Sequence, residues 1–270
     1  MRLWKLVPVA LAALGLAACG GGGALSLDPV AKAADKTSSA GSEKVSMTGT
    51  MDIAGQTIRM SGDGAFDTNA HTGTFAVDMQ PTGQSASLHM DEVMQGTTLY
   101  MKMPQSLSKL PKPWVKLDLQ QAGKKLGLDM SAMTSNQNDP SQMLDYLRAG
   151  GNVTKLGDDT VRGVATTHYR ARVDLRKAAD AAPASKRATV RKNAQRLIQL
   201  TGVKSYPVEV WIDGKSLVRR MKFTLNYGRL LGGAKFTISM DLYDFGTPVN
   251  VQAPPADEVV DISQLSGTGG

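Results

Sequence analysis

The segment "KVSMTGTMDIAGQTIRMSGDGAF" (residues 44–66) alternates apolar and polar side chains over two stretches separated by Ala54-Gly55-Gln56. A period of two on both sides of a short turn is the pattern of a β-hairpin with one buried face. The apolar side chains that share this face are Val45, Met47, Met51, Ile53, Ile58, Met60 and Phe66. The segment therefore predicts two antiparallel strands with an apolar face in common.

The alternation continues further along the chain. Three more segments show it: "TFAVDM" (74–79), "SLHM" (87–90) and "TTLYMKM" (97–103). Next, "LPKPWVKLDL" (110–119) predicts a short edge-like strand from Trp114 to Leu117, because proline is tolerated mainly at sheet edges. A weak helix is expected over 120–128, so the first half of the chain reads as a run of consecutive antiparallel strands.

The middle of the chain is predicted to be partly helical. Residues 139–149 form a candidate helix, with Asp139 as N-cap and an apolar stripe of Met143, Leu144 and Leu147. Residues 152–175 return to the period of strands, with a turn expected near 157–159.

Residues 174–202 are predicted to be helical in two pieces that Pro183 separates. The second piece is expected to bury the side chains of Val190, Ala194, Leu197 and Thr201. Three final strands are predicted in 206–214, 216–228 and 234–246. Strands dominate and do not alternate with helices, which favours an α+β domain with one antiparallel sheet.

The N-terminus has the three parts of a secretory leader: basic "MRLWK", an apolar stretch and a small-residue end. The apolar run from Leu3 to Ala18 is too short for a confident membrane span. Leu16-Ala17-Ala18-Cys19 has the form of a bacterial lipobox, which predicts a signal peptide over 1–18 and acylation of Cys19, the single cysteine. The alternative is an ordinary leader with a chance cysteine.

The residues after Cys19 are typical of a tether. Four glycines and no charge occur in residues 20–27, and eight flexible residues reach roughly 16 Å. A first helix is expected from Asp28 as N-cap to Gly41 as its stop. The predicted organisation is therefore a leader (1–18), an acylated tether (19–27) and one folded domain (28–265).

Charge and motifs argue against several classes of function. The formal charge is +7, of which Arg2 and Lys5 belong to the leader; the remaining 29 basic and 24 acidic groups give +5. This mild excess suits an anionic membrane surface and does not indicate a nucleic-acid binder. One cysteine permits no internal disulfide and no CxxC site.

No catalytic motif is present: the chain contains neither a G-x-S-x-G elbow nor a P-loop. The histidines, His71, His89 and His168, fall in separate strands, so we expect no metal site, no cofactor and no enzymatic activity. One helix carries a basic set, interpreted as a solvated face in preference to a lipid-phosphate site: Lys186, Arg187, Arg191, Lys192 and Arg196.

Methionine is abundant, with 14 residues, and aromatic residues make up only 5% of the chain. Nine methionines are assigned to predicted strands: Met47, Met51, Met60, Met79, Met90, Met101, Met103, Met221 and Met240. Because the methionine side chain is flexible and adapts to ligands of variable shape, this pattern favours a sheet face that accepts acyl chains. A methionine-rich ordinary core explains the composition equally well.

Three segments in the second half carry a resemblance: "GVATTHYRARVDL" (163–175), "YPVEVWIDGKSLVRRMKFTL" (206–225) and "DLYDFGTPVNVQAPPADEVVD" (241–261). They resemble the closing half of actinobacterial lipoproteins of the LppX/LprG type. The resemblance implies a LolA-like fold, a single strongly curved antiparallel half-barrel sheet with helices over its open side and an apolar cavity between. It also implies binding or transfer of lipids or lipidated glycans outside the cytoplasmic membrane.

These observations predict a lipid-anchored protein on the extracytoplasmic face of the cell membrane, acting as a monomer. Its expected partners are a lipid or lipoglycan ligand, the membrane through Cys19, and a membrane transporter, but no nucleic acid. A sensor or envelope-assembly module that binds a protein partner is the alternative. The residues expected to line the lipid cavity are Met47, Met51, Met60, Met79, Leu88, Met90, Leu99, Met101, Leu144, Leu147, Met221, Phe223, Ile238 and Met240.

Overall fold

The computed structural model describes residues 29–83, 85, 87–104, 110–129, 153–182, 184–227 and 233–262. Its strands are β1 (Ser42–Ile53), β2 (Gln56–Asp67), β3 (Thr72–Pro81), β4 (Leu88–Gln95), β5 (Thr98–Lys102), β6 (Trp114–Asp118), β7 (Thr154–Val161), β8 (Val164–Asp174), β9 (Ser205–Asp213), β10 (Val218–Asn226), β11 (Lys235–Tyr243) and β12 (Val259–Asp261). Its helices are α1 (Pro29–Ser38), α2 (Leu119–Leu126), α5 (Leu175–Ala181), α6 (Ala184–Thr201) and the short 3-10 helix η4 (Ala256–Glu258). The predicted helix over 139–149, with Leu144 and Leu147, lies outside the described residues.

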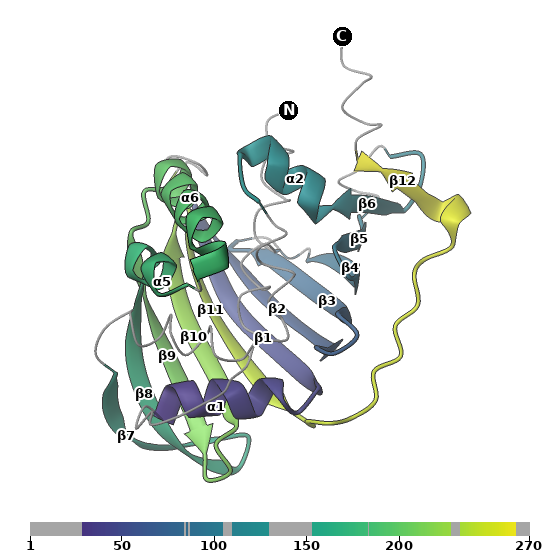
Figure 1. The fold of residues 1–270 in the computed structure, drawn as a ribbon. Helices are drawn as coiled ribbons and strands as arrows, with labels where there is room; N and C mark the ends of the chain where they lie inside the picture. The colour runs from purple at the N-terminus through teal and green to yellow at the C-terminus, as the bar shows by residue number, and fades with distance from the viewer. Residues whose placement is uncertain are drawn as a thin grey trace.

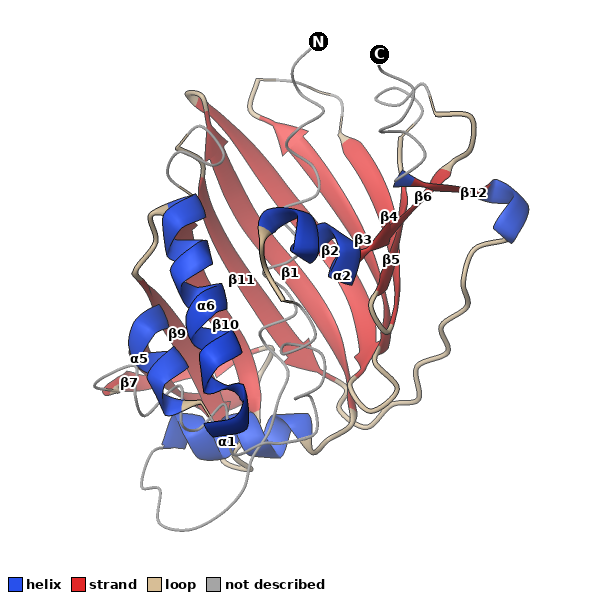
Figure 2. Ribbon diagram, turned by 45° about the horizontal axis from the view of Figure 1, so that its top comes forward, coloured by secondary structure: helices blue, strands red, loops and turns tan. Residues whose placement is uncertain are grey.

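All twelve strands form one sheet in the order β12-β6-β5-β4-β3-β2-β1-β11-β10-β9-β8-β7. Every neighbouring pair is antiparallel except β12 with β6, and the two ends of the sheet do not pair with each other. The sheet curves strongly, and α1, α2, α5 and α6 lie on its inner side (Figures 1 and 2). The prediction of an α+β fold with a curved, open, antiparallel sheet is confirmed.

The hairpin of β1 and β2 forms where the sequence predicts it. Ala54 and Gly55 both have positive φ angles, 51° and 79°, as the tight turns of twisted hairpins require. The pairing then continues without a register shift from Ile53 opposite Gln56 to Ser42 opposite Asp67. Pairing of β1 with β11 joins the first six strands, β1 to β6, to the strands β7 to β11, so this hairpin lies in the middle of the sheet.

The turn expected near 157–159 was wrong. Strand β7 runs through these residues, and the turn is formed by Arg162 and Gly163, with φ angles of 49° and 78°. Gly157, with φ 144°, instead lies at a register shift between β7 and β8. The glycine allows a local bulge without ending the strand.

The strand from Trp114 to Leu117 is present as β6, but it does not form the edge of the sheet. Residues Val259–Asp261 pair with it in parallel and form the edge strand β12. The chain between β11 and β12 runs around the outside of the molecule (Figure 1), and Pro248, Pro254 and Pro255 in it cannot donate backbone hydrogen bonds. Pairing therefore resumes only beyond these prolines.

The predicted helices α2, α5 and α6 are confirmed, and Pro183 separates α5 from α6. Asp118 caps α2 by accepting hydrogen bonds from the backbone N–H groups of Gln120 (2.8 Å) and Gln121 (3.0 Å). In α6, Ala194 and Thr201 are buried as expected, whereas Val190 and Leu197 are only half-buried. No helix among the described residues is both long and apolar enough to cross a bilayer.

Three arginines of the basic set in α6 donate hydrogen bonds to neighbouring segments of the chain. The Nε atoms of Arg187 and Arg196 donate to the carbonyl oxygens of Ala182 (2.9 Å) and Leu126 (2.7 Å). The Nε atom of Arg191 donates to Asp180 at 2.6 Å. These contacts favour a structural role over a lipid-phosphate site for this set.

A buried amide connects α6 to the residues after α2. Asn193 donates to the carbonyl of Asp129 at 2.8 Å and accepts from the Asp129 backbone N–H at 2.9 Å. We expect Asn193→Ala to lower the free energy of unfolding by about 1–3 kcal/mol, because it removes both hydrogen bonds at a buried position. Denaturant unfolding measures this, with exposed Lys192→Ala as control; equal effects of the two substitutions would contradict a role for this contact.

Candidate functional site

The inner face of the sheet carries two adjacent apolar rows. Residues opposite each other in paired strands share a face, so the register places one row from β9 to β4: Val210, Met221, Met240, Met47, Gly62, Val77 and Met90. The next row is Val208, Phe223, Ile238, Gly49, Met60, Met79 and Leu88. Nine of the residues predicted for the cavity lie in these two rows.

The remaining described candidates lie beside the rows. Met51 is opposite Phe236 and Ile58 in a third row. Leu99 and Met101 lie in β5, where they form a cluster with Met90 and Leu117 against which Leu119 and Ala122 of α2 pack. Among the methionines assigned to strands, Met103 lies beyond the end of β5, and Met94, which was not assigned, lies in β4.

The candidates differ in how deeply they are buried. Seven are buried: Met47, Met60, Met90, Leu99, Met101, Ile238 and Met240. Five are half-buried: Met51, Met79, Leu88, Met221 and Phe223. The half-buried side chains are the part of this face that stays partly exposed in the described structure.

Glycines on the inner face let two aromatic rings lie against the backbone. A Cβ atom at Gly62 or Gly64 would collide with the ring of Phe75, and one at Gly73 would collide with the ring of Phe66. The two phenyl rings stack with centroids 6.1 Å apart. Glycine within strands is a common means of bending a sheet. This arrangement was not predicted, although "GDGAF" (62–66) and "GTF" (73–75) place glycines at inward positions of their strands.

Two carboxyl groups interrupt the apolar inner face. Glu92 of β4 is 3% exposed, and among the described residues neither of its buried oxygens has a hydrogen-bond partner; burial raises its pKa to about 8. Glu43 of β1 is 6% exposed, and burial, with a smaller effect from Asp67, raises its pKa to about 7. Sequence reasoning missed both, although Glu92 occupies an apolar position of the pattern Leu88-x-Met90-x-Glu92-x-Met94.

The histidines lie outside this face. His89 and His168 fall in strands as expected, but His71 does not: it lies in the turn between β2 and β3, with a φ angle of 55°. His89 is exposed, and its Nδ1 and Nε2 atoms lie 2.9 Å and 3.0 Å from carboxylate oxygens of Asp78 and Asp91. Both hydrogen bonds raise the pKa of His89, and the one to Asp78 has the larger effect. The ring of His168 stacks on Trp211 with centroids 3.9 Å apart. Within the described ranges, no three His, Cys, Asp or Glu side chains are arranged to hold a metal ion.

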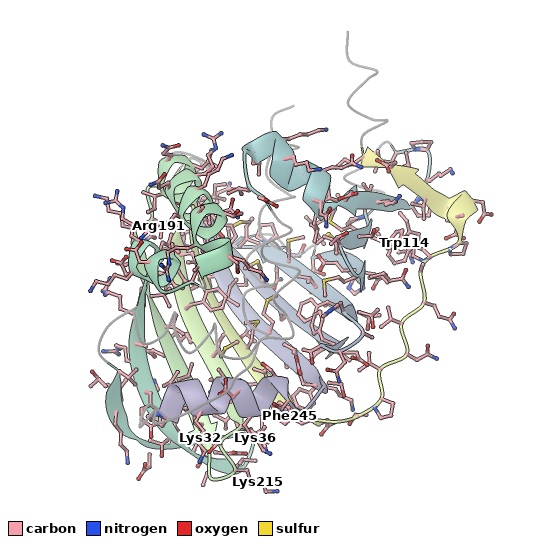
Figure 3. The ribbon with its side chains drawn as sticks, viewed as in Figure 1. Lys32, Lys36, Trp114, Arg191, Lys215 and Phe245 are labelled. Atoms are coloured by element: carbon pink, nitrogen blue, oxygen red, sulfur yellow. The ribbon has the colours of Figure 1, made fainter. Side chains whose placement is uncertain are left out.

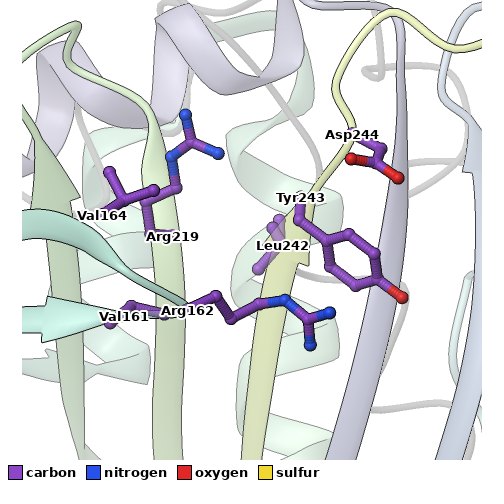
Figure 4. Close-up of a pocket in the computed structure, with 7 residues that line it drawn as sticks. All are labelled: Val161, Arg162, Val164, Arg219, Leu242, Tyr243 and Asp244. Carbon is purple, nitrogen blue, oxygen red and sulfur yellow. The ribbon is translucent and has the colours of Figure 1, made fainter.

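A pocket of about 300 Å³ lies at one end of the strands, between the β7–β8 turn, the start of β10 and the end of β11 (Figure 4). Its lining residues are Val161, Arg162, Val164, Arg219, Leu242, Tyr243 and Asp244. The Arg162 guanidinium lies over the Tyr243 ring, 3.9 Å from its centroid, and the Nε atom of Arg219 donates to Asp213 at 2.7 Å. The pocket includes none of the residues predicted to line a lipid cavity.

Basic side chains gather at this end of the molecule. Figure 3 shows Lys32 and Lys36 of α1 near Lys215, which lies between β9 and β10. Helix α1 is joined to the start of β10, where the hydroxyl of Thr37 accepts a hydrogen bond of 2.8 Å from the Val218 backbone N–H. Acidic side chains lie at this end as well: Asp213 accepts from Arg219, and Asp244 pairs with Lys44 at 2.9 Å.

No family model matches the chain. In sequence it is similar to an uncharacterized 31.2 kDa protein from the rplA–rplJ intergenic region of Streptomyces griseus, with 30% identity over 168 residues, 59% of this chain and 51% of that protein. The chain thus spans about half the length of the curated relative that it matches.

The structure is similar to that of the lipoprotein LppX from Mycobacterium tuberculosis, with a TM-score of 0.50, 16% identity, and coverage of 83% of this chain and 96% of LppX. It also matches LprF from Mycobacterium bovis, with a TM-score of 0.45, 14% identity, and coverage of 87% of this chain and 100% of LprF. The fold is that of an open, curved sheet with helices on its inner side. It is an LppX-type lipoprotein fold, which confirms the fold expected from the sequence.

Proposed function

We propose that this protein binds the acyl chains of a lipid on the inner face of its sheet. The two apolar rows carry the proposal, because they bring nine of the predicted residues together on the side that the helices face. The LppX-type fold supports it as a fold found in a lipoprotein. The ligand is a lipid or a lipidated glycan, and the protein transfers it to the cell envelope.

The balance of free energy suits a carrier that loads and unloads. Burial is worth about 0.8 kcal/mol per CH₂ group, so a 16-carbon chain gains about 12 kcal/mol on leaving water. A chain that comes from a bilayer has already left water, and the protein need only match the membrane to within a few kcal/mol. The flexible side chains of Met51, Met79 and Met221 provide contacts that can be exchanged easily.

The proposal places the protein at the outer face of the cytoplasmic membrane. In it, residues 1–18 are a signal peptide, and acylated Cys19 with the tether to residue 27 holds the domain of residues 28–265 near the bilayer. The end of the molecule that carries Lys32, Lys36 and Lys215 then faces anionic headgroups, to which each basic side chain near the surface adds about 1 kcal/mol of attraction.

Transfer from vesicles tests the proposal. Residues 28–270 are mixed with phosphatidylglycerol vesicles that contain a pyrene-labelled acyl lipid, and the loss of pyrene excimer fluorescence reports uptake by the protein. We expect saturable uptake with about one lipid per protein. No uptake of lipids with one, two or three acyl chains would contradict lipid binding and would favour the protein-binding module.

A further inference from the structure

Glu92 lies where the sequence pattern and the sheet call for an apolar residue. It faces inward from β4, directly opposite Phe75 of β3 and Met101 of β5. Along its own strand the neighbours on the same face are Met90 and Met94. The carboxyl group is therefore surrounded within the sheet by phenyl and methionine side chains.

The carboxyl group has no partner of its own within the described structure. Neither Oε1 nor Oε2 accepts or donates a hydrogen bond. The nearest ion pair along the strand, Asp91 with Lys102 at 3.8 Å, belongs to the alternate residues and hence to the outer face. Glu92 is thus uncompensated by any cation from β3 or β5.

A buried carboxyl group of this kind lowers the stability of the fold. A buried polar group without a hydrogen bond destabilises a fold by about 1–3 kcal/mol, and a methionine would continue the row at no such cost. Departures of this kind from the local pattern are expected at functional positions. Because burial raises its pKa to about 8, the group is a neutral carboxylic acid at pH 7, with one donor and one acceptor.

We propose that Glu92 is the polar contact of the lipid-binding face and recognises a hydroxyl group of an otherwise apolar ligand, such as the free hydroxyl of a diacylglycerol. A hydroxyl both donates and accepts, so it can satisfy both parts of a neutral carboxylic acid without bringing a charge into the apolar face. The acyl chains then lie along the Met47 and Met60 rows. This inference rests on the proposed function and adds the chemical class of the ligand.

Two lipids that differ by one hydroxyl group test the inference. The probes are 1,2-dipalmitoylglycerol and propane-1,2-diol dipalmitate, each loaded from vesicles into residues 28–270 at pH 7 and quantified by mass spectrometry. We expect the wild-type protein to prefer the hydroxylated lipid about tenfold, the ratio that about 1.4 kcal/mol of hydrogen bonding gives. Glu92→Met should abolish this preference and bring the ratio in which the two lipids are loaded close to one.

Glu92→Gln is the matched control, because an amide keeps one donor and one acceptor group without the charge. It should retain most of the preference. Loss of the preference in Glu92→Gln would overturn the assignment of a neutral carboxylic acid, because the hydroxyl would then require an ionised carboxylate as its acceptor. Equal binding of both probes by the wild type would overturn the inference but leave lipid binding intact, whereas failure of both probes to bind would count against the proposed function itself.

Discussion

Raising the pH from 5 to 8.5 should lower the free energy of unfolding by several kcal/mol. The pKa of Glu92 is about 8 and that of Glu43 about 7 in the folded protein, against an ordinary value of 4.5 for an exposed glutamate. Above pH 4.5 the unfolded chain releases protons that the folded protein retains, so each pH unit of the interval destabilises the fold by up to about 1.4 kcal/mol per group. The loss is complete only above the folded pKa values.

Urea unfolding at half-unit steps between pH 5 and 8.5 measures this dependence, and Glu92→Gln isolates one part of it. The raised pKa of His89 acts in the same direction, so the difference between wild type and Glu92→Gln is the informative quantity. We expect this difference to grow with pH in favour of the glutamine variant. Exposed Glu258→Gln is the control, and a pH dependence unchanged by Glu92→Gln would show that Glu92 is not buried as described.

Arginine on the half-buried part of the inner face should abolish lipid uptake. Met51→Arg and Phe223→Arg each place a charge on the surface that acyl chains contact, and burying it unpaired costs several kcal/mol. These positions are half-buried, so the variants can fold. Arginine at Met90 or Leu99, which are buried, would test folding instead of binding.

Thr48→Arg is the matched control for this experiment. Thr48 lies in β1 between Met47 and Gly49, but it is exposed on the opposite face. We expect uptake from pyrene-lipid vesicles to fall at least about tenfold in Met51→Arg and Phe223→Arg and to remain unchanged in Thr48→Arg. The reverse pattern would place the ligand on the outer face and contradict the proposed site.

The period of two was sufficient to predict the inner face. Alternation alone assigns Met47, Met60 and Met240 to one side of their strands, and this side is the one that is buried. Which of these residues lie side by side depends on the register of the strands, and tight turns such as Ala54-Gly55 determine that register. The sequence pattern therefore identified most members of the candidate site, but not which of them lie opposite each other in paired strands.

Other features leave little local signal. The pairing of β12 with β6 brings together segments more than 140 residues apart through only three residues in each strand. The contact of His89 with Asp78 joins two strands and depends on their register. The turn at Arg162-Gly163 was missed because "GDD" resembles a turn equally well, and only the sheet shows that Gly157 forms a bulge.

Native mass spectrometry of the protein purified from its own host tests the central claim most directly. The claim is that the inner face of the sheet holds acyl chains. We expect a bound species whose extra mass is that of a lipid, present in the wild type and in Thr48→Arg but absent from Phe223→Arg. A protein that carries no lipid from its host, or that carries the same lipid after Phe223→Arg, would rule out acyl-chain binding on this face.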